Sequence, residues 1–117
     1  DEMSLGAATR VGELRNGEIL EDEMHPEDFG MPMMSHRGLR VDNAQESRQM
    51  LLQAIEGQAG TPFEIVCLNA GAALYTAGLA DSIAQGLALA RETARSGAAR
   101  KKLESFILLS QQLGASA

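Results

Sequence analysis

The most apolar stretch of the chain, residues 62–77, carries no continuous polar face and is interrupted mainly by Asn69. A helix that is apolar all round is a buried one, so this segment is predicted to be the most buried helix of the fold. Its start combines Thr61, Pro62 and Glu64. Threonine suits the helix cap, proline the first helical position and glutamate the third, which together indicate a helix start.

Three further helices are predicted at residues 43–56, 82–96 and 98–113, because apolar side chains recur there at helical spacing. The expected buried stripes are Leu51, Ala54 and Ile55, extended by Ala44 and Ser47, in the first; Ile83, Leu87, Ala90 and Ala94 in the second; and Leu103, Phe106, Ile107, Ser110 and Leu113 in the third. The arginine and lysines at 100–102 are interpreted as a solvated face.

Residues that cap helices mark the ends of these segments. Asn43 is the expected cap of the first, with Glu46 returning a bond to the cap's N–H, and Asp81 is the expected cap of the segment at 82–96. Gly57 supplies a left-handed stop for the first, and Gly97 ends the segment at 82–96. Within the apolar helix, Asn69 is expected to make a structural hydrogen bond, Gly71 to admit a neighbouring backbone, and Cys67 to be an inert core thiol.

Before residue 43 the pattern changes from helical to alternating. Residues 9–23 are predicted to form a β-hairpin around Asn16-Gly17, whose positive φ angles suit a type I′ turn. A two-residue loop pairs Arg15 with Glu18, Leu14 with Ile19 and Arg10 with Glu23. The alternation of apolar positions is imperfect, which favours a sheet edge or an outlying ribbon. A loop follows to residue 42, with one helical turn at 26–30 that ends at Gly30.

Composition narrows the class of protein. The 10 Lys and Arg against 16 Asp and Glu give a net charge of −6, which is not the electrostatic signature of a nucleic-acid-binding protein. The single cysteine, Cys67, fits a reducing cytoplasm, where we expect the protein to act. No apolar run reaches the ~18 residues of a membrane span, so no membrane partner is expected.

One pair of residues is a candidate for chemistry: Asp1 and Glu2. Adjacent carboxylates offer hard oxygen ligands to Mg²⁺, which keeps several waters and takes further ligands from a substrate phosphate. The alternative is solvated charge at a terminus. His25 and His36 match no metal spacing and are expected to be solvated. The sequence contains neither a glycine-rich phosphate loop nor a pairing of histidine with a nucleophile, so no catalytic residue is assigned.

Seven stretches, taken in order, resemble the anthranilate phosphoribosyltransferase family. They are residues 1–4 (DEMS), 9–14 (TRVGEL), 16–19 (NGEI), 25–30 (HPEDFG), 68–75 (LNAGAALY), 86–92 (GLALARE) and 96–103 (SGAARKKL). The resemblance implies an α/β parent fold, with a small helical N-terminal domain and a large α/β domain built on a central sheet. Residues 1–117 would be the C-terminal part of that large domain, a β-hairpin followed by about four α-helices.

The family's activity is the transfer of the phosphoribosyl group from phosphoribosyl pyrophosphate to anthranilate in tryptophan biosynthesis, by an enzyme expected to be a homodimer. By resemblance, Glu2 contacts two magnesium ions and Asp1 contacts one. The family's glycine-rich loop and its Lys-His-Gly-Asn segment, which bind the two substrates, would lie upstream of Asp1, so this chain alone is expected to be inactive. The alternatives are a related nucleoside phosphorylase-type protein and a non-enzymatic helical interaction module.

Overall fold

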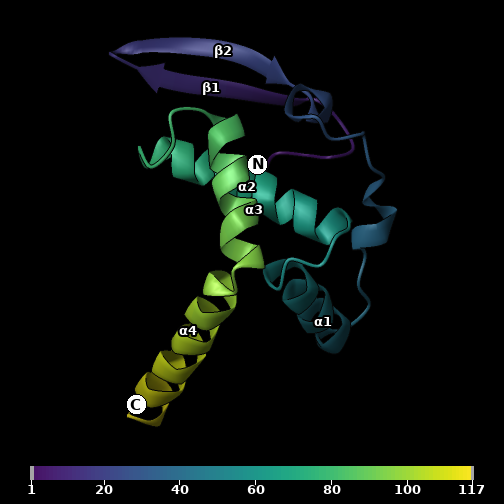
Figure 1. The fold of residues 1–117 in the computed structure, drawn as a ribbon, viewed down its shortest axis with the longest axis vertical. Coiled ribbons are helices and arrows are strands. Elements are labelled where there is room, and N and C mark those ends of the chain that lie inside the picture. The colour runs from purple at the N-terminus through teal and green to yellow at the C-terminus, as the bar shows by residue number, and fades with distance from the viewer. Residues whose placement is uncertain (1, 117) are drawn as a thin grey trace. The chain divides into compact units, whose positions relative to one another are not determined.

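The computed structural model describes residues 2–116 and divides into two compact units, Asp1–Arg40 and Val41–Ala117. The first unit contains strands β1 (Thr9–Arg15) and β2 (Glu18–Met24) and two short 3-10 helices, η1 (Pro26–Phe29) and η2 (His36–Leu39). The second contains helices α1 (Ala44–Ile55), α2 (Thr61–Thr76), α3 (Ile83–Arg95) and α4 (Ala98–Ala115), as Figure 1 shows. The predicted hairpin followed by four helices is confirmed.

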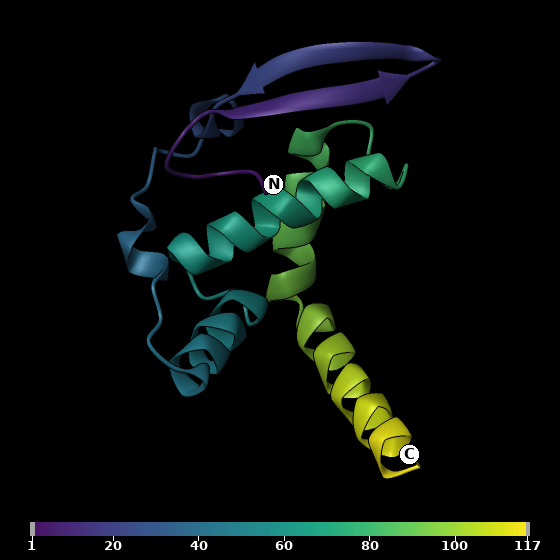
Figure 2. The ribbon, with the colours of Figure 1, turned by 180° about the vertical axis from the view of Figure 1, so that it is seen from behind.

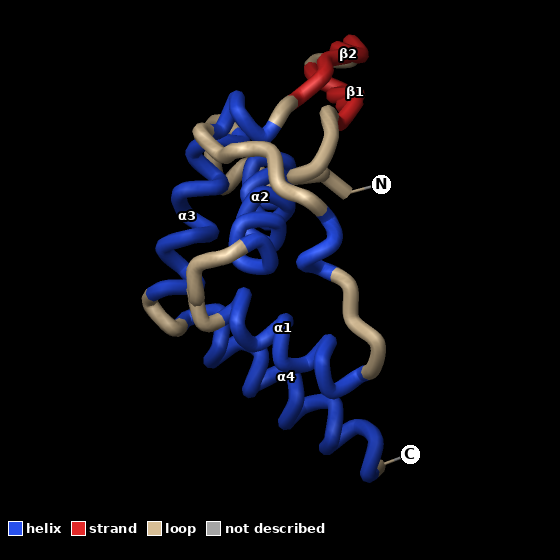
Figure 3. The backbone as a smooth tube through the Cα atoms, turned by 90° about the vertical axis from the view of Figure 1, so that its right-hand side faces the viewer, coloured by secondary structure: helices blue, strands red, loops and turns tan. Residues whose placement is uncertain are grey.

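The hairpin has the predicted register. Arg15 faces Glu18, and the antiparallel ladder continues to the pair of Thr9 and Met24. Asn16 and Gly17 have φ angles of 52° and 83°, the positive values that a type I′ turn requires. Within residues 2–116 no third strand joins this ribbon, which is red in Figure 3. The expectation of an outlying ribbon therefore holds for the described chain.

The segment after the hairpin holds one expected turn and one that was not expected. η1 ends at Gly30, as predicted, and this glycine has a left-handed φ of 69°. η2 lies in what was predicted to be a loop. It is capped by Ser35, whose side chain accepts a hydrogen bond of 3.2 Å from the backbone N–H of Arg37. A single turn is too short to show a helical hydrophobic period, which explains why the pattern missed it.

The core of the second unit lies where α2 and α3 cross, an arrangement seen from opposite sides in Figures 1 and 2. Gly71 of α2 meets Gly86 of α3: a Cβ built on Gly86 would lie 2.2 Å from the carbonyl oxygen of Gly71. This confirms that Gly71 admits a neighbouring backbone. Around the crossing, the buried side chains include Phe63, Cys67, Leu68, Ile83, Leu87, Ala90 and Ala94.

Helix α2, predicted to be the most buried helix because it is apolar all round, is buried on one side and partly open on another. Leu68 is 1% exposed, as expected, but Val66 is 45% exposed and Ala73 and Ala77 are also open to solvent. The open side forms an apolar groove of about 460 Å³ that α2 shares with α1, α3 and α4. An all-apolar sequence indicates that a helix can be buried on all sides, but burial also needs enough packing partners.

The stripes of α1 and α4 are also more exposed than predicted. Phe106 is 64% exposed, and Leu51, Ile107 and Leu113 likewise face solvent. The other exposed stripe positions are Ala44, Ser47 and Ser110; Ala54 is buried, and Ile55 and Leu103 are half-buried. Figures 1 and 3 show α4 extending beyond the other helices of this unit. No described element of the unit covers most of its length, which is the reason for the difference.

Three predicted caps differ in detail. Ser82 caps α3 in place of Asp81, accepting a 3.1 Å hydrogen bond from the N–H of Gln85. Gly60, rather than Thr61, is the cap residue of α2. Asn43 caps α1 as predicted, but the Glu46 carboxylate accepts from the N–H of Asp42 and the Asn43 side-chain amide. Each shift is one residue. At α1 and α3, neighbouring polar residues compete for the same free N–H groups, whereas Gly60 of α2 makes no side-chain cap bond.

Gly57 and Gly97, with φ angles of 75° and 81°, lie just past the ends of α1 and α3 as predicted. None of the helices described here has both the length and the hydropathy that a membrane span requires.

Candidate metal site at the amino-terminal loop

The two predicted magnesium ligands are the first two residues of the chain. Asp1 lies outside the described residues, and Glu2 is exposed. Among residues 2–116, no three His, Cys, Asp or Glu side chains gather into a metal-binding group. Any metal held here would therefore depend on the acidic pair together with waters and a ligand from elsewhere.

The loop that carries Glu2 is anchored by its apolar side chains and its backbone. Met3 and Leu5 are buried, at 9% and 0% exposure. The backbone N–H of Ser4 donates a 3.0 Å hydrogen bond to the Thr9 hydroxyl, and the Leu5 carbonyl accepts a 2.7 Å bond from the Met34 N–H. Because residues 3–5 are held in this way, the backbone next to Glu2 has a defined position.

A second set of contacts joins the loop to η2. The Ser4 hydroxyl accepts a 3.0 Å hydrogen bond from the Gly6 N–H and shares a 3.1 Å hydrogen bond with Nε2 of His36. His36 was expected to be solvated. Its ring is exposed, but it is also held against the loop, and this contact between residues 32 positions apart could not be read from local sequence.

The donor chemistry of the acidic pair fits magnesium. Mg²⁺ is commonly bound by one or two carboxylates, several waters and substrate phosphate oxygens, rather than by a complete protein cage. Asp1 and Glu2 would supply two hard oxygen ligands. His25, the other histidine, lies 3.4 Å from a Glu23 carboxylate oxygen and belongs to the hairpin end.

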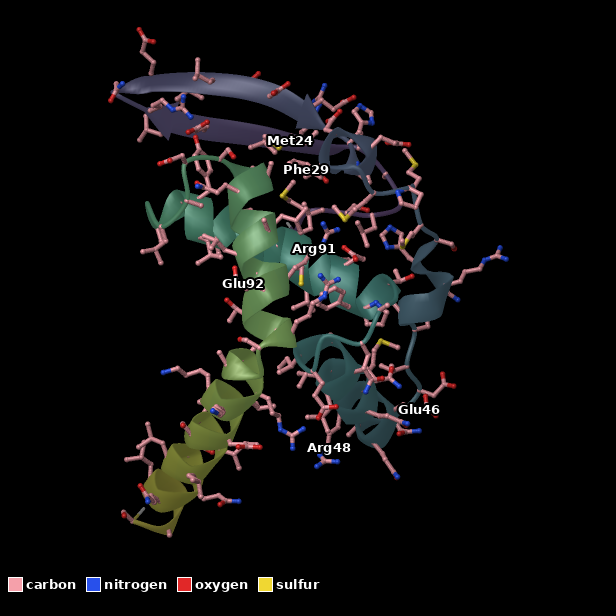
Figure 4. All side chains as sticks on the ribbon, viewed as in Figure 1. Met24, Phe29, Glu46, Arg48, Arg91 and Glu92 are labelled. Carbon is pink, nitrogen blue, oxygen red and sulfur yellow. The ribbon has the colours of Figure 1, made fainter. Side chains whose placement is uncertain are left out.

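The charged groups of the second unit are structural ties between helices. Arg91 of α3 pairs with Glu64 of α2 at 2.5 Å, and both side chains are less than one-third exposed. Arg91 and Glu92 project to different sides of α3 in Figure 4. Arg95 lies over the Phe63 ring, 5.2 Å from its centroid. Both contacts join residues on different helices, so the spacing of residues along the chain does not predict them.

Arg100 corrects the interpretation of residues 100–102 as a simple solvated face. Its guanidinium pairs with Glu56 at the end of α1 and with Glu104 one turn along α4. The Glu104 spacing follows the i, i+4 rule and was readable in the sequence. The Glu56 contact depends on how α1 and α4 approach each other.

The remaining polar residues of α2 behave as predicted. The Asn69 amide donates a 3.0 Å hydrogen bond to the Ile65 carbonyl one turn earlier, a structural role. Cys67 is buried and is not in a disulfide. Burial, reinforced by the Glu64 charge, raises the pKa of the Cys67 thiol to about 11, so the thiol is protonated at neutral pH. This is the chemistry of a core residue and not of a nucleophile.

We expect Cys67 to react with iodoacetamide at pH 8.5 about a hundredfold more slowly in the folded protein than in denaturant. An unfolded cysteine, with a pKa near ~8.5, is then half thiolate, whereas the raised pKa leaves well under about 1% thiolate. The raised pKa of Cys67 also makes the free energy of unfolding depend on pH. Its stabilising contribution is complete below about pH 8.5 and is lost as the pH rises toward 11, because the thiol ionises at a lower pH in the unfolded chain than in the folded one. Equal alkylation rates in the two states would contradict the assignment.

Residues 1–100 match the model of the glycosyl transferase family, a/b domain. The chain therefore belongs to that family. The match includes both the hairpin and the helices through the start of α4, which a helical interaction module unrelated to the family would not explain.

Several relatives named anthranilate phosphoribosyltransferase are similar to the chain. The one from Dechloromonas aromatica is 64% identical over 107 residues, covering 92% of this chain and 32% of the relative. The one from Cupriavidus necator is 58% identical over 112 residues, covering 96% and 33%. The one from Herminiimonas arsenicoxydans is 57% identical over 117 residues, covering 100% and 34%. The chain thus spans about one-third of the length of the curated relatives it matches.

The crystal structure of anthranilate phosphoribosyltransferase from Thermus thermophilus has the same fold over most of this chain. The TM-score is 0.79 at 32% identity, covering 92% of this chain and 32% of that one. The predicted resemblance is confirmed, and so is the fold class: a β-hairpin and four helices that match a fragment of that protein's fold.

Proposed function

We propose that residues 1–117 are the C-terminal part of the large α/β domain of an anthranilate phosphoribosyltransferase. The parent protein, meaning a protein of the relatives' length that carries this chain, would move the phosphoribosyl group from phosphoribosyl pyrophosphate to the amine of anthranilate. Pyrophosphate would leave, and the product would enter tryptophan biosynthesis.

The observation that carries this proposal is the 57–64% identity to proteins of that name over nearly the whole chain. The chemistry of the chain is compatible with it. A phosphoribosyl pyrophosphate molecule is strongly anionic, and a chain with a net charge of −6 has to hold it through local groups or a metal. Asp1 and Glu2 would allow such an anion to be held, because they would bind a cation that in turn binds the pyrophosphate.

Asp1 and Glu2 would hold magnesium, with Glu2 reaching two ions and Asp1 one. When bound, Mg²⁺ neutralises the developing charge of a leaving pyrophosphate. The structure supports this proposal through Glu2, which is exposed on a loop held by the burial of Met3 and Leu5. Both substrates would be bound by segments outside this chain, so these residues bring metal ligands and not a substrate pocket.

The wider assignments rest on the resemblance. We propose that the parent protein is a cytoplasmic homodimer without nucleic-acid or membrane partners. The excess of Asp and Glu over Lys and Arg in this chain supports the absence of a nucleic-acid partner. A protein that neutralises nucleic-acid phosphates needs an excess of Lys and Arg.

The test is an assay of purified parent protein with phosphoribosyl pyrophosphate, anthranilate and magnesium. Loss of anthranilate fluorescence together with release of pyrophosphate is expected, and both should stop when a chelator removes the metal. Residues 1–117 alone, expressed in a host without its own enzyme, should give no product, because positioning of both substrates supplies a large part of the rate. A parent protein that is inactive with these substrates would overturn the proposal.

A further inference from the structure

We propose that Ser4 and His36 are positioning residues for the acidic pair. The hydrogen bond between the His36 imidazole and the Ser4 hydroxyl, here called the clasp, holds the loop that carries Glu2. The inference deepens the proposed function and rests on it. It concerns how the metal-binding carboxylates are held, and neither residue is proposed to touch metal or substrate.

The first support is the hydrogen bonding of the Ser4 side chain. Its hydroxyl has two partners, the Gly6 N–H at 3.0 Å and His36 Nε2 at 3.1 Å. Two partners in different directions favour one side-chain rotamer and close a tight turn between residues 4 and 6. Ser4 is two positions from Glu2, and the residue between them, Met3, is buried. The turn at Ser4 and the burial of Met3 therefore act together to set the direction of the backbone at Glu2.

The second support is the space left at Gly6. A Cβ built on Gly6 would lie 2.6 Å from His36 Nε2 and 2.8 Å from its Cδ2. Gly6 does not have a positive φ angle, so its backbone conformation is open to other residues. The glycine is therefore needed for room: it makes the recess in which the imidazole ring lies. A merely solvated histidine would not require such a recess.

The third support is that His36 is itself held in place from both sides. The preceding segment bonds to the loop through the Met34 N–H and the Leu5 carbonyl, at 2.7 Å. The Ser35 hydroxyl caps the η2 turn by accepting from the Arg37 N–H. The His36 ring thus projects from a backbone that is already bonded to the loop. Forming the hydrogen bond to Ser4 therefore costs little additional conformational entropy.

The expected effect follows from what outer partners do at metal sites. Groups that orient a ligand typically change metal affinity or activity by roughly 10–100-fold when removed. The clasp acts on Glu2 through the backbone of the loop, so we expect the lower end. Ser4→Ala and His36→Ala should each raise the magnesium concentration for half-maximal turnover about tenfold. Turnover at saturating magnesium should stay within about twofold, because the carboxylates themselves remain.

The experiment uses the parent protein and two readouts. Magnesium titrations of turnover give the metal requirement, and electron paramagnetic resonance with Mn²⁺ and pyrophosphate measures binding without catalysis. His36→Gln keeps a polar group near the position of Nε2 and should restore most of the affinity. Gly6→Ala should weaken metal binding at least as much as His36→Ala, because its methyl group would displace the ring and would also lie 3.0 Å from the Met34 carbonyl oxygen. His25→Ala is the matched control, since that histidine pairs with Glu23 in the hairpin, and it should change neither readout.

The outcomes separate this inference from the proposed function. If wild-type protein is active and Glu2→Gln weakens metal binding, but Ser4→Ala and His36→Ala only lower the melting temperature, the positioning role is wrong and the function stands. If the wild type lacks transferase activity, the proposed function fails, and the Mn²⁺ measurement still decides the positioning role. If the wild type binds no Mn²⁺ even with pyrophosphate, both are overturned.

Discussion

Replacing Gly86 by alanine should destabilise the parent protein by about 2 kcal/mol, because there is no room for a methyl group where α2 and α3 cross. The added Cβ would lie 2.2 Å from the Gly71 carbonyl oxygen, and a Cβ on Gly71 would lie 2.5 Å from the Leu87 nitrogen. Both obstacles are backbone atoms, which cannot rotate away as a side chain can. Overpacking typically costs ~1–3 kcal/mol, and the ~1 kcal/mol by which alanine favours a helix over glycine offsets only part of it.

The measurement is the shift in the urea or thermal unfolding midpoint of the parent protein. Gly114→Ala is the matched control. That glycine lies in α4, and a Cβ there would meet nothing within 4 Å. Only the helix propensity remains, so the control should be neutral or stabilising by up to about 1 kcal/mol. Equal effects of the two substitutions would mean that α2 and α3 do not meet backbone to backbone.

Replacing Glu2 by glutamine should lower the turnover of the parent protein roughly a hundredfold at limiting magnesium, or about 2.7 kcal/mol in the barrier. Glutamine keeps the size of the side chain but removes the charge that attracts the metal, so the leaving pyrophosphate is less neutralised. Asp1→Asn should have a smaller effect, because one metal contact is proposed for Asp1 and two for Glu2. The loss should fall mainly on turnover, since the substrates are held elsewhere.

Steady-state kinetics across a magnesium titration provide the test. Glu21→Gln removes the same charge from the exposed hairpin and should leave the kinetics unchanged. If Glu2 and Asp1 are only solvated surface carboxylates, their replacement should be equally silent, with stability changes within about ±0.5 kcal/mol. An unchanged turnover and an unchanged magnesium dependence for Glu2→Gln would rule out the pair as the metal site.

The sequence predicted the hairpin turn and the helix ends, because these depend on residues that are neighbours along the chain. Asn16-Gly17 predicted both the hairpin and its register, because two positive φ angles allow only a few turn types. The ends of the helices were predicted to within two residues, since Asn43, Gly57 and Gly97 act on the backbone beside them. The buried stripe of α3 was also correct, because α2 covers that face.

What could not be predicted depends on residues far apart in the chain. The period of α4 identified an apolar stripe, but its exposure depends on whether another element covers it. Gly86 became notable only once its crossing with Gly71 was visible. At the candidate site, resemblance and carboxylate chemistry pointed to Asp1 and Glu2. The bond between Ser4 and His36 joins the amino-terminal loop to η2, and no rule of sequence spacing predicts it.

The contact between Gly71 and Gly86 also has an evolutionary consequence. Every other amino acid begins its side chain with the same Cβ, so no replacement at either position avoids the clash, however conservative it looks elsewhere. Because the obstructing atoms belong to the main chain, repacking neighbouring side chains cannot relieve the clash, and a replacement at either position requires the two helices to move apart. Variation is therefore expected to be tolerated more readily at the side chains around the crossing than at Gly71 and Gly86.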